Sequence, residues 1–180
     1  HSESKVMEDI VKVECKKNQC RLIIKSLEST KITSNIESRL RKLRYNKLEE
    51  IRTEISADYI VTAHHADDQV ETILMKILNS SGLDGMQGIR KINQKIIRPC
   101  RDISKKEIID YANQNRLSYV NDPTNLDTIF TRNFLRKKII PELKKIKNDI
   151  HVPFIDFTKR VEDVQELILF NVQSFCNTSN

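Results

Sequence analysis

The chain has 180 residues, of which 38% are hydrophobic and 31% are charged, and its formal net charge at pH 7 is +6. This length suits one compact domain with its own core. No apolar run approaches the roughly 20 residues that span a bilayer, so we expect no membrane partner, and no signal peptide is recognised. The four cysteines lack C-x-x-C spacing, which favours reduced thiols in a cytoplasmic protein over disulfides or a zinc site.

The N-terminal third predicts two helices with a strand between them. Residues 2–18 carry the apolar stripe of a helix, and Arg21–Lys25 has the composition of a strand. Ser34 and Glu37 have the S-x-x-E spacing of a capping box, which predicts the start of a second helix. The inner side of that helix is expected to carry Ile36, Leu40, Leu43, Leu48, Ile51 and Ile55. Its basic outer side, which includes Arg44, is on charge count alone a solvated face.

The stretch Tyr59–Gly88 is the most informative part of the chain. Its apolar start, Tyr59–Val61, predicts a buried parallel strand. The helical pattern that follows has one apolar face, formed by Val70, Ile73, Leu74, Ile77 and Leu78. The histidines and aspartates between strand and helix lie at the carboxyl end of a strand, where α/β sheets usually bind ligands.

Two interpretations of this polar corner stay open. Asp68 and Glu71 are three residues apart, so Asp68 could cap the helix with Glu71 as its capping-box partner. The same carboxylates, together with His64 and His65, could instead hold Mg²⁺ or bind the ammonium group of a substrate. Both interpretations can hold at once.

The loop after this helix contains Gly82, Gly85 and Gly88. Its spacing differs from G-x-x-x-x-G-K-[ST], and it follows a helix. These features favour a helix C-cap followed by turns over a phosphate-binding loop.

The remainder of the chain adds further predicted elements. Ile96–Pro99 suits a short strand closed by proline, and Ser104–Glu107 is a second capping box that opens a helix. Asn121–Asn125 has the composition of a turn. The segment Arg132–Lys147 has a strong excess of lysine and arginine, which favours contact with a nucleic-acid backbone, and Pro141 is expected in the first turn of a helix.

The C-terminal segment predicts a long amphipathic helix after a linker at His151–Pro153. Its apolar stripe is Phe157, Val161, Val164, Ile168, Val172 and Phe175. We therefore predict two regions, a domain of residues 1–148 and an amphipathic linker-helix region of residues 149–180. Strands that alternate with helices predict an α/β fold with a parallel sheet and flanking helices.

The string TAHHADDQVETILMKILNSSGLDGMQGI resembles the second signature of the N-type ATP pyrophosphatases of the PP-loop class, and among them the tRNA(Ile)-lysidine synthase family. NIESRLRKLRYNKL before it, and R-P, N-D-P-T-N and T-R-N-x-x-R after it, match in the right order. The combination is far more specific than any one motif. It covers about Asn35 to Leu143 closely and implies a Rossmann-like, adenine nucleotide alpha hydrolase-like fold.

The resemblance implies an ATP-dependent carbon–nitrogen ligase with ATP and Mg²⁺ as cofactors. Such an enzyme adenylates the C2 oxygen of the wobble cytidine in a tRNA(Ile) that has a CAU anticodon. The amine of free L-lysine then displaces AMP and leaves lysidine. The site must therefore neutralise phosphate charge and hold lysine.

Seven residues carry over from the resemblance, and none of them is assigned as a metal ligand. Catalytic roles fall to Asp68, Arg44 and Arg132, and binding roles to His65, Glu71, Asn133 and Arg136. Asp68 would pair with the ammonium group of lysine. Arg44 and Arg132 would reach toward phosphate or the activated cytidine, since the arginine fork pairs well with phosphate oxygens.

The ATP loop of the family, S-G-G-x-D-S, does not occur between His1 and Asn180. We therefore expect these residues to be part of a longer enzyme, without its first strand or strands, and inactive alone. The alternatives are a non-catalytic or degenerate tRNA-binding remnant and another PP-loop enzyme that modifies tRNA. The lack of paired cysteines argues against a thiolase.

Overall fold

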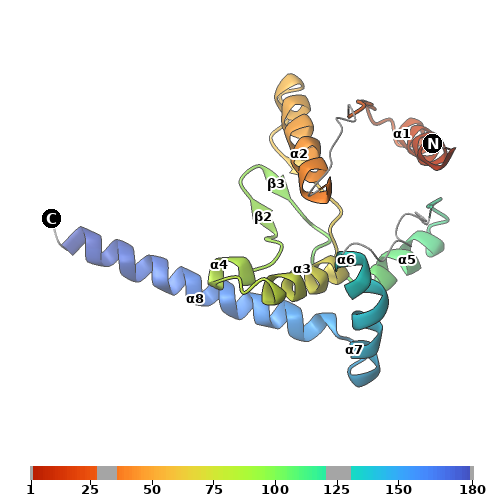
Figure 1. Cartoon of the computed structure of the whole chain (residues 1–180). Coiled ribbons are helices and arrows are strands. Elements are labelled where there is room, and N and C mark those ends of the chain that lie inside the picture. Colours follow the sequence, from red (N-terminus) through yellow and green to blue (C-terminus); the bar gives the residue numbers. More distant parts are fainter. Residues whose placement is uncertain (1, 28–35, 121–130, 179–180) are drawn as a thin grey trace.

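The computed structural model describes residues 2–27, 36–120 and 131–178, and helices predominate in it (Figure 1). The helices are α1 (Ser2–Lys17), α2 (Ile36–Glu54), α3 (Ala66–Leu78), α4 (Leu83–Met86), α5 (Lys105–Gln114), α6 (Thr131–Phe134), α7 (Ile140–Ile146) and α8 (His151–Thr178). A π-helical turn, η2 (Leu135–Ile139), joins α6 to α7. The predicted turn at Asn121–Asn125 lies outside the described residues.

The strands β1 (Ile60–Val61), β2 (Ile92–Asn93) and β3 (Ile96–Ile97) form one small sheet in the order β1-β3-β2. β1 and β3 are parallel, with Val61 opposite Ile97, as expected for strands separated by a helix. β2 runs antiparallel to β3, so the sheet is mixed rather than wholly parallel as predicted. The sequence gives little sign of β2, because its hairpin turns through Gln94 at positive φ without a glycine.

The core lies between α3, α7 and the start of α8. Val70, Ile140 and Ile150 form its buried centre, against which Leu74, Leu143 and Phe154 pack. The predicted face of α3 is confirmed at Val70, Ile73 and Leu74. It is wrong at Ile77 and Leu78, which are exposed in the last turn of α3.

Gln69 anchors α3 to the loop that precedes the hairpin. Its side chain is fully buried, donates a hydrogen bond to the carbonyl of Gln87 (3.0 Å), and accepts one from the backbone N–H of Ile89 (2.6 Å). Gly88 lies between these two at a φ of +64°, and a Cβ there would come within 2.8 Å of the Gln69 amide. Glycine is therefore required at this position on two grounds, backbone conformation and space.

Helix α8 begins at His151, so the predicted linker His151–Pro153 is helical. Pro153 is tolerated because the first turn of a helix has no intrahelical partner for its missing N–H. The first half of α8 lies along α3 and α4 and buries Ile155, Thr158 and Val161.

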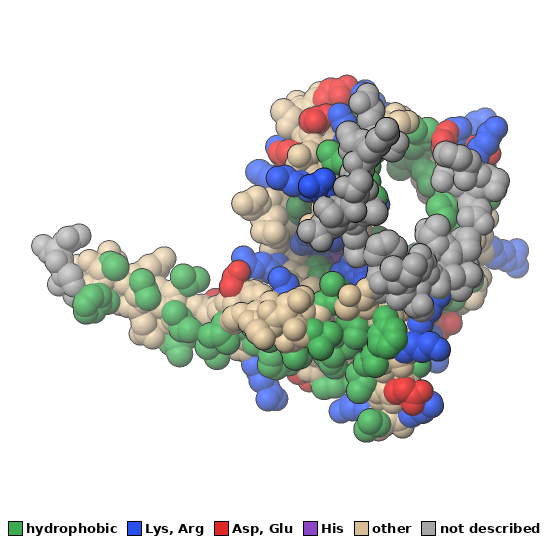
Figure 2. All heavy atoms as spheres, in the orientation of Figure 1, with side chains coloured by type: hydrophobic (Ala, Val, Ile, Leu, Met, Phe, Trp, Pro, Cys, Tyr) green, Lys and Arg blue, Asp and Glu red, His purple; other side chains and the backbone are tan. Residues whose placement is uncertain are grey.

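The predicted apolar stripe of α8 is confirmed only at Val161. Its other five members are exposed: Phe157, Val164, Ile168, Val172 and Phe175. Figure 2 shows hydrophobic side chains on the surface along the outer part of this helix. No helix in the described ranges is both long and apolar enough to cross a membrane.

The N-terminal predictions are partly wrong. The helix predicted for residues 2–18 is confirmed as α1, but Arg21–Lys25 forms no strand, because no other described segment pairs with it. The predicted inner side of α2 is exposed at Leu40, Leu43 and Ile55, since α2 meets little of the fold beyond β1.

Candidate functional site at the start of helix α3

The polar corner after β1 is built on the first turns of α3. His65 is the N-cap residue, and its backbone N–H donates a hydrogen bond to Oδ2 of Asp68 at 3.0 Å. The predicted capping pair of Asp68 and Glu71 is therefore wrong by one helical turn. As a result, Glu71 is not used in capping and faces other side chains. Asp67 and Asp68 also lie where the helix dipole favours negative charge.

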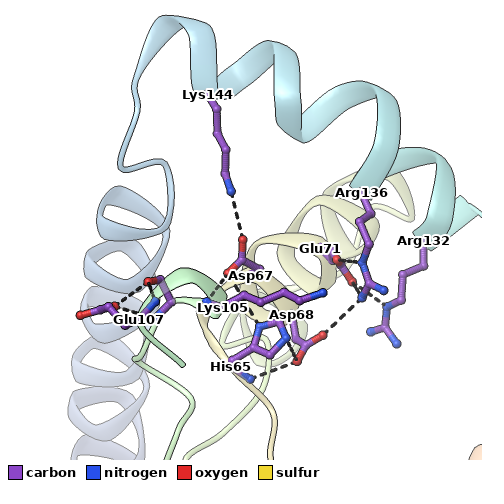
Figure 3. Close-up of polar contacts among 10 residues, drawn as sticks. His65, Asp67, Asp68, Glu71, Lys105, Glu107, Arg132, Arg136 and Lys144 are labelled. Atoms are coloured by element: carbon purple, nitrogen blue, oxygen red, sulfur yellow. Dashed lines mark hydrogen bonds and ion pairs between the residues drawn. The ribbon is translucent and has the colours of Figure 1, made fainter. Parts of the chain in front are cut away.

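Glu71 is the buried centre of an arginine cluster. Its side chain is 1% exposed and accepts two hydrogen bonds from Arg136, at 2.5 Å from Nε and 2.9 Å from Nη2. Nε of Arg132 lies 3.4 Å from Oε2 of Glu71, and Arg132 also donates to the hydroxyl of Thr72. Figure 3 shows both arginines reaching from the segment of α6 and η2 toward this carboxylate. The hydrogen bond to Glu71 raises the pKa of Arg136, so its charge is fixed.

Asp67 connects α3 to two further elements. The backbone N–H of Lys105, at the start of α5, donates to Oδ2 at 2.9 Å, and Nζ of Lys144 in α7 donates to Oδ1 at 3.1 Å. Burial opposes the charged carboxylate, but these two hydrogen bonds outweigh it and lower the pKa of Asp67. Asp67 therefore holds α5 and α7 in place around the corner.

Asp68 differs from Asp67 in having one oxygen without a short contact. Oδ2 caps the helix and lies 3.5 Å from Nε2 of His65, whereas Oδ1 lies 3.5 Å from Nη2 of Arg136. The side chain keeps 18% of its surface exposed. This oxygen is thus placed to accept a hydrogen bond from an ammonium group that approaches from solvent.

His64, directly before the N-cap, is a neutral imidazole at pH 7. Burial lowers its pKa to about 4, and the nearby positive charge of Arg41 contributes, while Asp68 opposes the shift. One ring nitrogen, Nδ1, is hydrogen-bonded to the hydroxyl of Thr62 at 2.9 Å.

The structure brings together five of the seven predicted site residues: His65, Asp68, Glu71, Arg132 and Arg136. Asn133 is half-buried on α6 beside Arg132. Arg44 is exposed on α2, and no ion pair or hydrogen bond joins it to the corner within the described part of the chain. The α2 arginine whose charge reaches the corner is Arg41, one turn earlier.

Sequence reasoning also missed the roles of Asp67 and Lys144. Both stood within segments that had been singled out, the H-H-x-D-D string and the basic stretch after Arg132. Nothing local to either segment indicates that they pair. Across the described ranges, no three His, Cys, Asp or Glu side chains are placed to hold a metal ion.

Comparison with known proteins identifies the family of this chain. Residues 1–143 match the PP-loop domain. The chain is 38% identical over 138 residues to a tRNA(Ile)-lysidine synthase of Borrelia garinii subsp. bavariensis, covering 77% of this chain and 31% of that protein. It is 36% identical over 166 residues to that of Bacteroides thetaiotaomicron, with 90% and 39% covered. The Bacillus subtilis protein of this name is 39% identical over 138 residues, with 74% and 29% covered.

The chain thus spans about a third of the length of these curated relatives. Among solved structures, it resembles the U34-tRNA thiolase NcsA from Methanococcus maripaludis with its [4Fe-4S] cluster. The TM-score is 0.68 at 17% identity, and the match covers 87% of this chain and 56% of the thiolase. This likeness supports the predicted adenine nucleotide alpha hydrolase-like fold. The match over residues 1–143 implies ATP binding, and the chain belongs to the PP-loop domain family.

Proposed function

We propose that the protein containing this chain is a tRNA(Ile)-lysidine synthase. It joins free L-lysine to C2 of the wobble cytidine in tRNA(Ile) with a CAU anticodon, by way of an adenylated intermediate. The observation that carries the proposal is the cluster of Asp68, Glu71, Arg132 and Arg136, which combines a part-exposed carboxylate that can accept from an amine with two arginine cations of the kind that bind phosphate. Relatives of this name at 36–39% identity support the same reaction.

In this reaction, Asp68 binds the lysine. An ammonium group brings three donors, and Oδ1 of Asp68, whose side chain keeps 18% of its surface exposed, offers an acceptor. Because His64 is neutral at pH 7, it adds no charge that would repel the amine. The ε-ammonium of lysine held here first loses one proton to solvent. The ε-amine nitrogen then forms a bond to C2, and the C2–O bond to AMP breaks, so that AMP leaves.

Arg132 and Arg136 neutralise phosphate charge during adenylation and AMP release. Their side chains keep 24% and 30% of their surface exposed, while the buried carboxylate of Glu71 contacts both guanidinium groups. Fixed cations that need no rearrangement stabilise charge that develops on a phosphate. Asn133 and His65 support the same site, and Arg44 is proposed to reach it only through contact with substrate.

Mg²⁺ is proposed to enter with ATP as a phosphate-bound ion. Protein sites for Mg²⁺ often use one or two carboxylates plus substrate phosphates. Here the Asp67 and Glu71 carboxylates are already engaged by cations and backbone N–H groups, so the corner is not arranged as a metal site. We also retain the division into residues 1–148 and 149–180, and the cytoplasm as compartment, as proposals.

Lysidine formation by the full-length protein with Asp68→Asn tests the assignment. Asparagine keeps an oxygen for the His65 N–H but loses the charge, so stability should change by less than about 1 kcal/mol. The KM for lysine should rise roughly tenfold to a hundredfold, because a charge-assisted hydrogen bond is lost.

Asp110→Asn provides the matched control, since Asp110 is exposed on α5. Unchanged lysidine formation in Asp68→Asn would remove Asp68 from the site. Salt-dependent tRNA binding by the wild-type protein without any ATP turnover would instead support the non-catalytic tRNA-binding alternative.

A further inference from the structure

Arg98 is a buried cation that has no carboxylate partner. Its residue surface is 5% exposed, and it forms no ion pair within the described structure. Nη1 donates a hydrogen bond to the backbone carbonyl of Arg90 at 2.8 Å, whereas Nε is buried without any hydrogen-bond partner there. The R-P dipeptide that contains Arg98 was one of the sequence motifs, yet the proposed reaction leaves it unused.

A nearby arginine shows how such a charge is usually compensated. Arg101 is equally buried, at 4% exposed, but pairs with Asp102 at 2.8 Å and with Glu162 at 3.0 Å. Burying an ionised group is unfavourable unless it is paired and hydrogen-bonded. The missing partner of Arg98 therefore indicates an anion that is supplied from outside the chain.

The position of Arg98 identifies where that anion would lie. Arg98 follows β3 directly, and Thr62 follows β1; the N–H of Thr62 bonds to the carbonyl of Ile97 at 3.0 Å. Both residues thus leave the parallel pair at its carboxyl edge, the usual ligand edge of an α/β sheet. Three positive charges act on His64 in this region, those of Arg41, Arg98 and Arg132, and Asp68 opposes them. The edge is net positive and suits a phosphate group.

We infer that Arg98 is a nucleotide-binding residue whose guanidinium contacts a phosphate of ATP at the carboxyl edge of β1 and β3. The low exposure of Arg98 favours a nucleotide over RNA as its ligand. A phosphate within a tRNA backbone is flanked by further nucleotides and cannot enter a nearly buried position as a small ligand can. This inference rests on ATP being the co-substrate in the proposed function. It adds an assigned phosphate contact outside the α3 corner.

The test is ATP and pyrophosphate binding by the full-length protein, measured by titration calorimetry without tRNA. Arg98→Gln removes the charge but keeps a donor for the carbonyl of Arg90. ATP affinity should fall roughly tenfold to a hundredfold, the range for losing a charge-assisted contact. Affinity for tRNA, measured separately, should stay within about twofold, well inside the tenfold that 1.4 kcal/mol represents.

Arg101→Gln is the matched control, and thermal unfolding without ligand separates the two arginines. Arg101→Gln leaves Glu162 without its cation and leaves Asp102 with Lys91 alone, at 3.6 Å, so it should lower the unfolding temperature while ATP affinity is kept. Arg98→Gln removes an unpaired charge and should leave the unfolding temperature unchanged or raise it.

Two outcomes would overturn the inference. One is normal ATP affinity in Arg98→Gln, whether or not its stability falls. The other is a loss of tRNA affinity alone, which would assign Arg98 to the RNA. Failure of the proposed function is a separate result, since a wild-type protein that binds ATP through Arg98 but makes no lysidine would contradict only the reaction.

Discussion

Two charged clusters of this chain have opposite arrangements. At the start of α3 the buried member is a carboxylate, Glu71 at 1% exposed, and its partners Arg132 and Arg136 are 24% and 30% exposed. At the junction with α8 the buried member is a cation, Arg101 at 4% exposed, and its partners Asp102 and Glu162 are each 31% exposed. Each cluster joins segments far apart in the sequence.

The difference separates a binding surface from a structural contact. A buried carboxylate that holds exposed arginines from behind presents positive charge to an incoming phosphate. A buried arginine surrounded by exposed carboxylates presents none, and it serves to hold α8 against the segment after β3. Which member of an ion pair is buried therefore indicates whether the pair can meet an anionic ligand.

Glu71→Gln should give the largest change, because it breaks the α3 cluster at its buried member. Losing one partner of a buried pair is strongly destabilising, and we expect about 2–4 kcal/mol, reduced from the fully buried case because the arginines reach water. Urea denaturation measures the change. Glu142→Gln, on an exposed pair with Lys145, should change stability by less than about 1 kcal/mol. Equal effects of the two variants would contradict the central position of Glu71.

Glu162→Gln should give an intermediate change, because Arg101 keeps its contact with Asp102. We expect a loss of about 1 kcal/mol, with ATP affinity and lysidine formation unaffected. The same urea experiment applies, with Glu166→Gln, exposed further along α8, as the control. Loss of lysidine formation in a folded Glu162→Gln variant would show that the α8 junction belongs to the functional site. The two clusters would then not differ in function.

At pH 7, His64 should give the smallest change in stability, because the ring is mainly neutral in both the folded and the unfolded chain, and its effect appears only as the pH falls. Its pKa is lowered from 6.5 to about 4, first by burial and then by Arg41. Between these two pH values, the unfolded chain binds a proton at His64 that the folded chain does not bind. The free energy of unfolding therefore falls as the pH drops from about 6.5 to about 4. NMR titration of the ring should give a midpoint near 4, with His64→Gln identifying the resonance. A midpoint at or above 6.5 would show that the corner is neither buried nor positive.

Sequence patterns predicted those parts of the fold around the site that depend only on neighbouring residues. The strand end at Val61 and the capping box at Ser104 each depend on neighbouring residues, and the structure confirms them. The family motifs also selected five residues that the structure gathers. Arg44 was selected from the family motif, and its role stays a prediction. The charge of Arg41, one turn earlier on the same helix, reaches His64, and periodicity alone cannot say which turn meets a neighbour.

Predictions that depended on a distant partner did less well. Arg21–Lys25 has a strand composition, but a strand forms only where another segment pairs with it. The apolar stripe of α8 indicates a need for a partner surface but not where that surface lies, and α3 and α4 cover only the first half of the helix. Pairing of Asp67 with Lys144, and the unpaired state of Arg98, depend on three-dimensional packing that no short window encodes.

The π-helical turn η2 determines the direction around the helix axis in which the side chains before and after it point. Between Arg132 and Lys144 an unbroken α-helix, at about 100° per residue, would leave the two side chains about 120° apart. A π turn takes up one additional residue, which reduces that angle to about 20°. Both side chains thereby face α3, where Arg132 meets Glu71 and Lys144 meets Asp67. The extra residue within Leu135–Ile139 thus lets one helical segment engage two carboxylates. Deleting that residue would disturb the pair of contacts, whereas substituting either cation would remove only one of them.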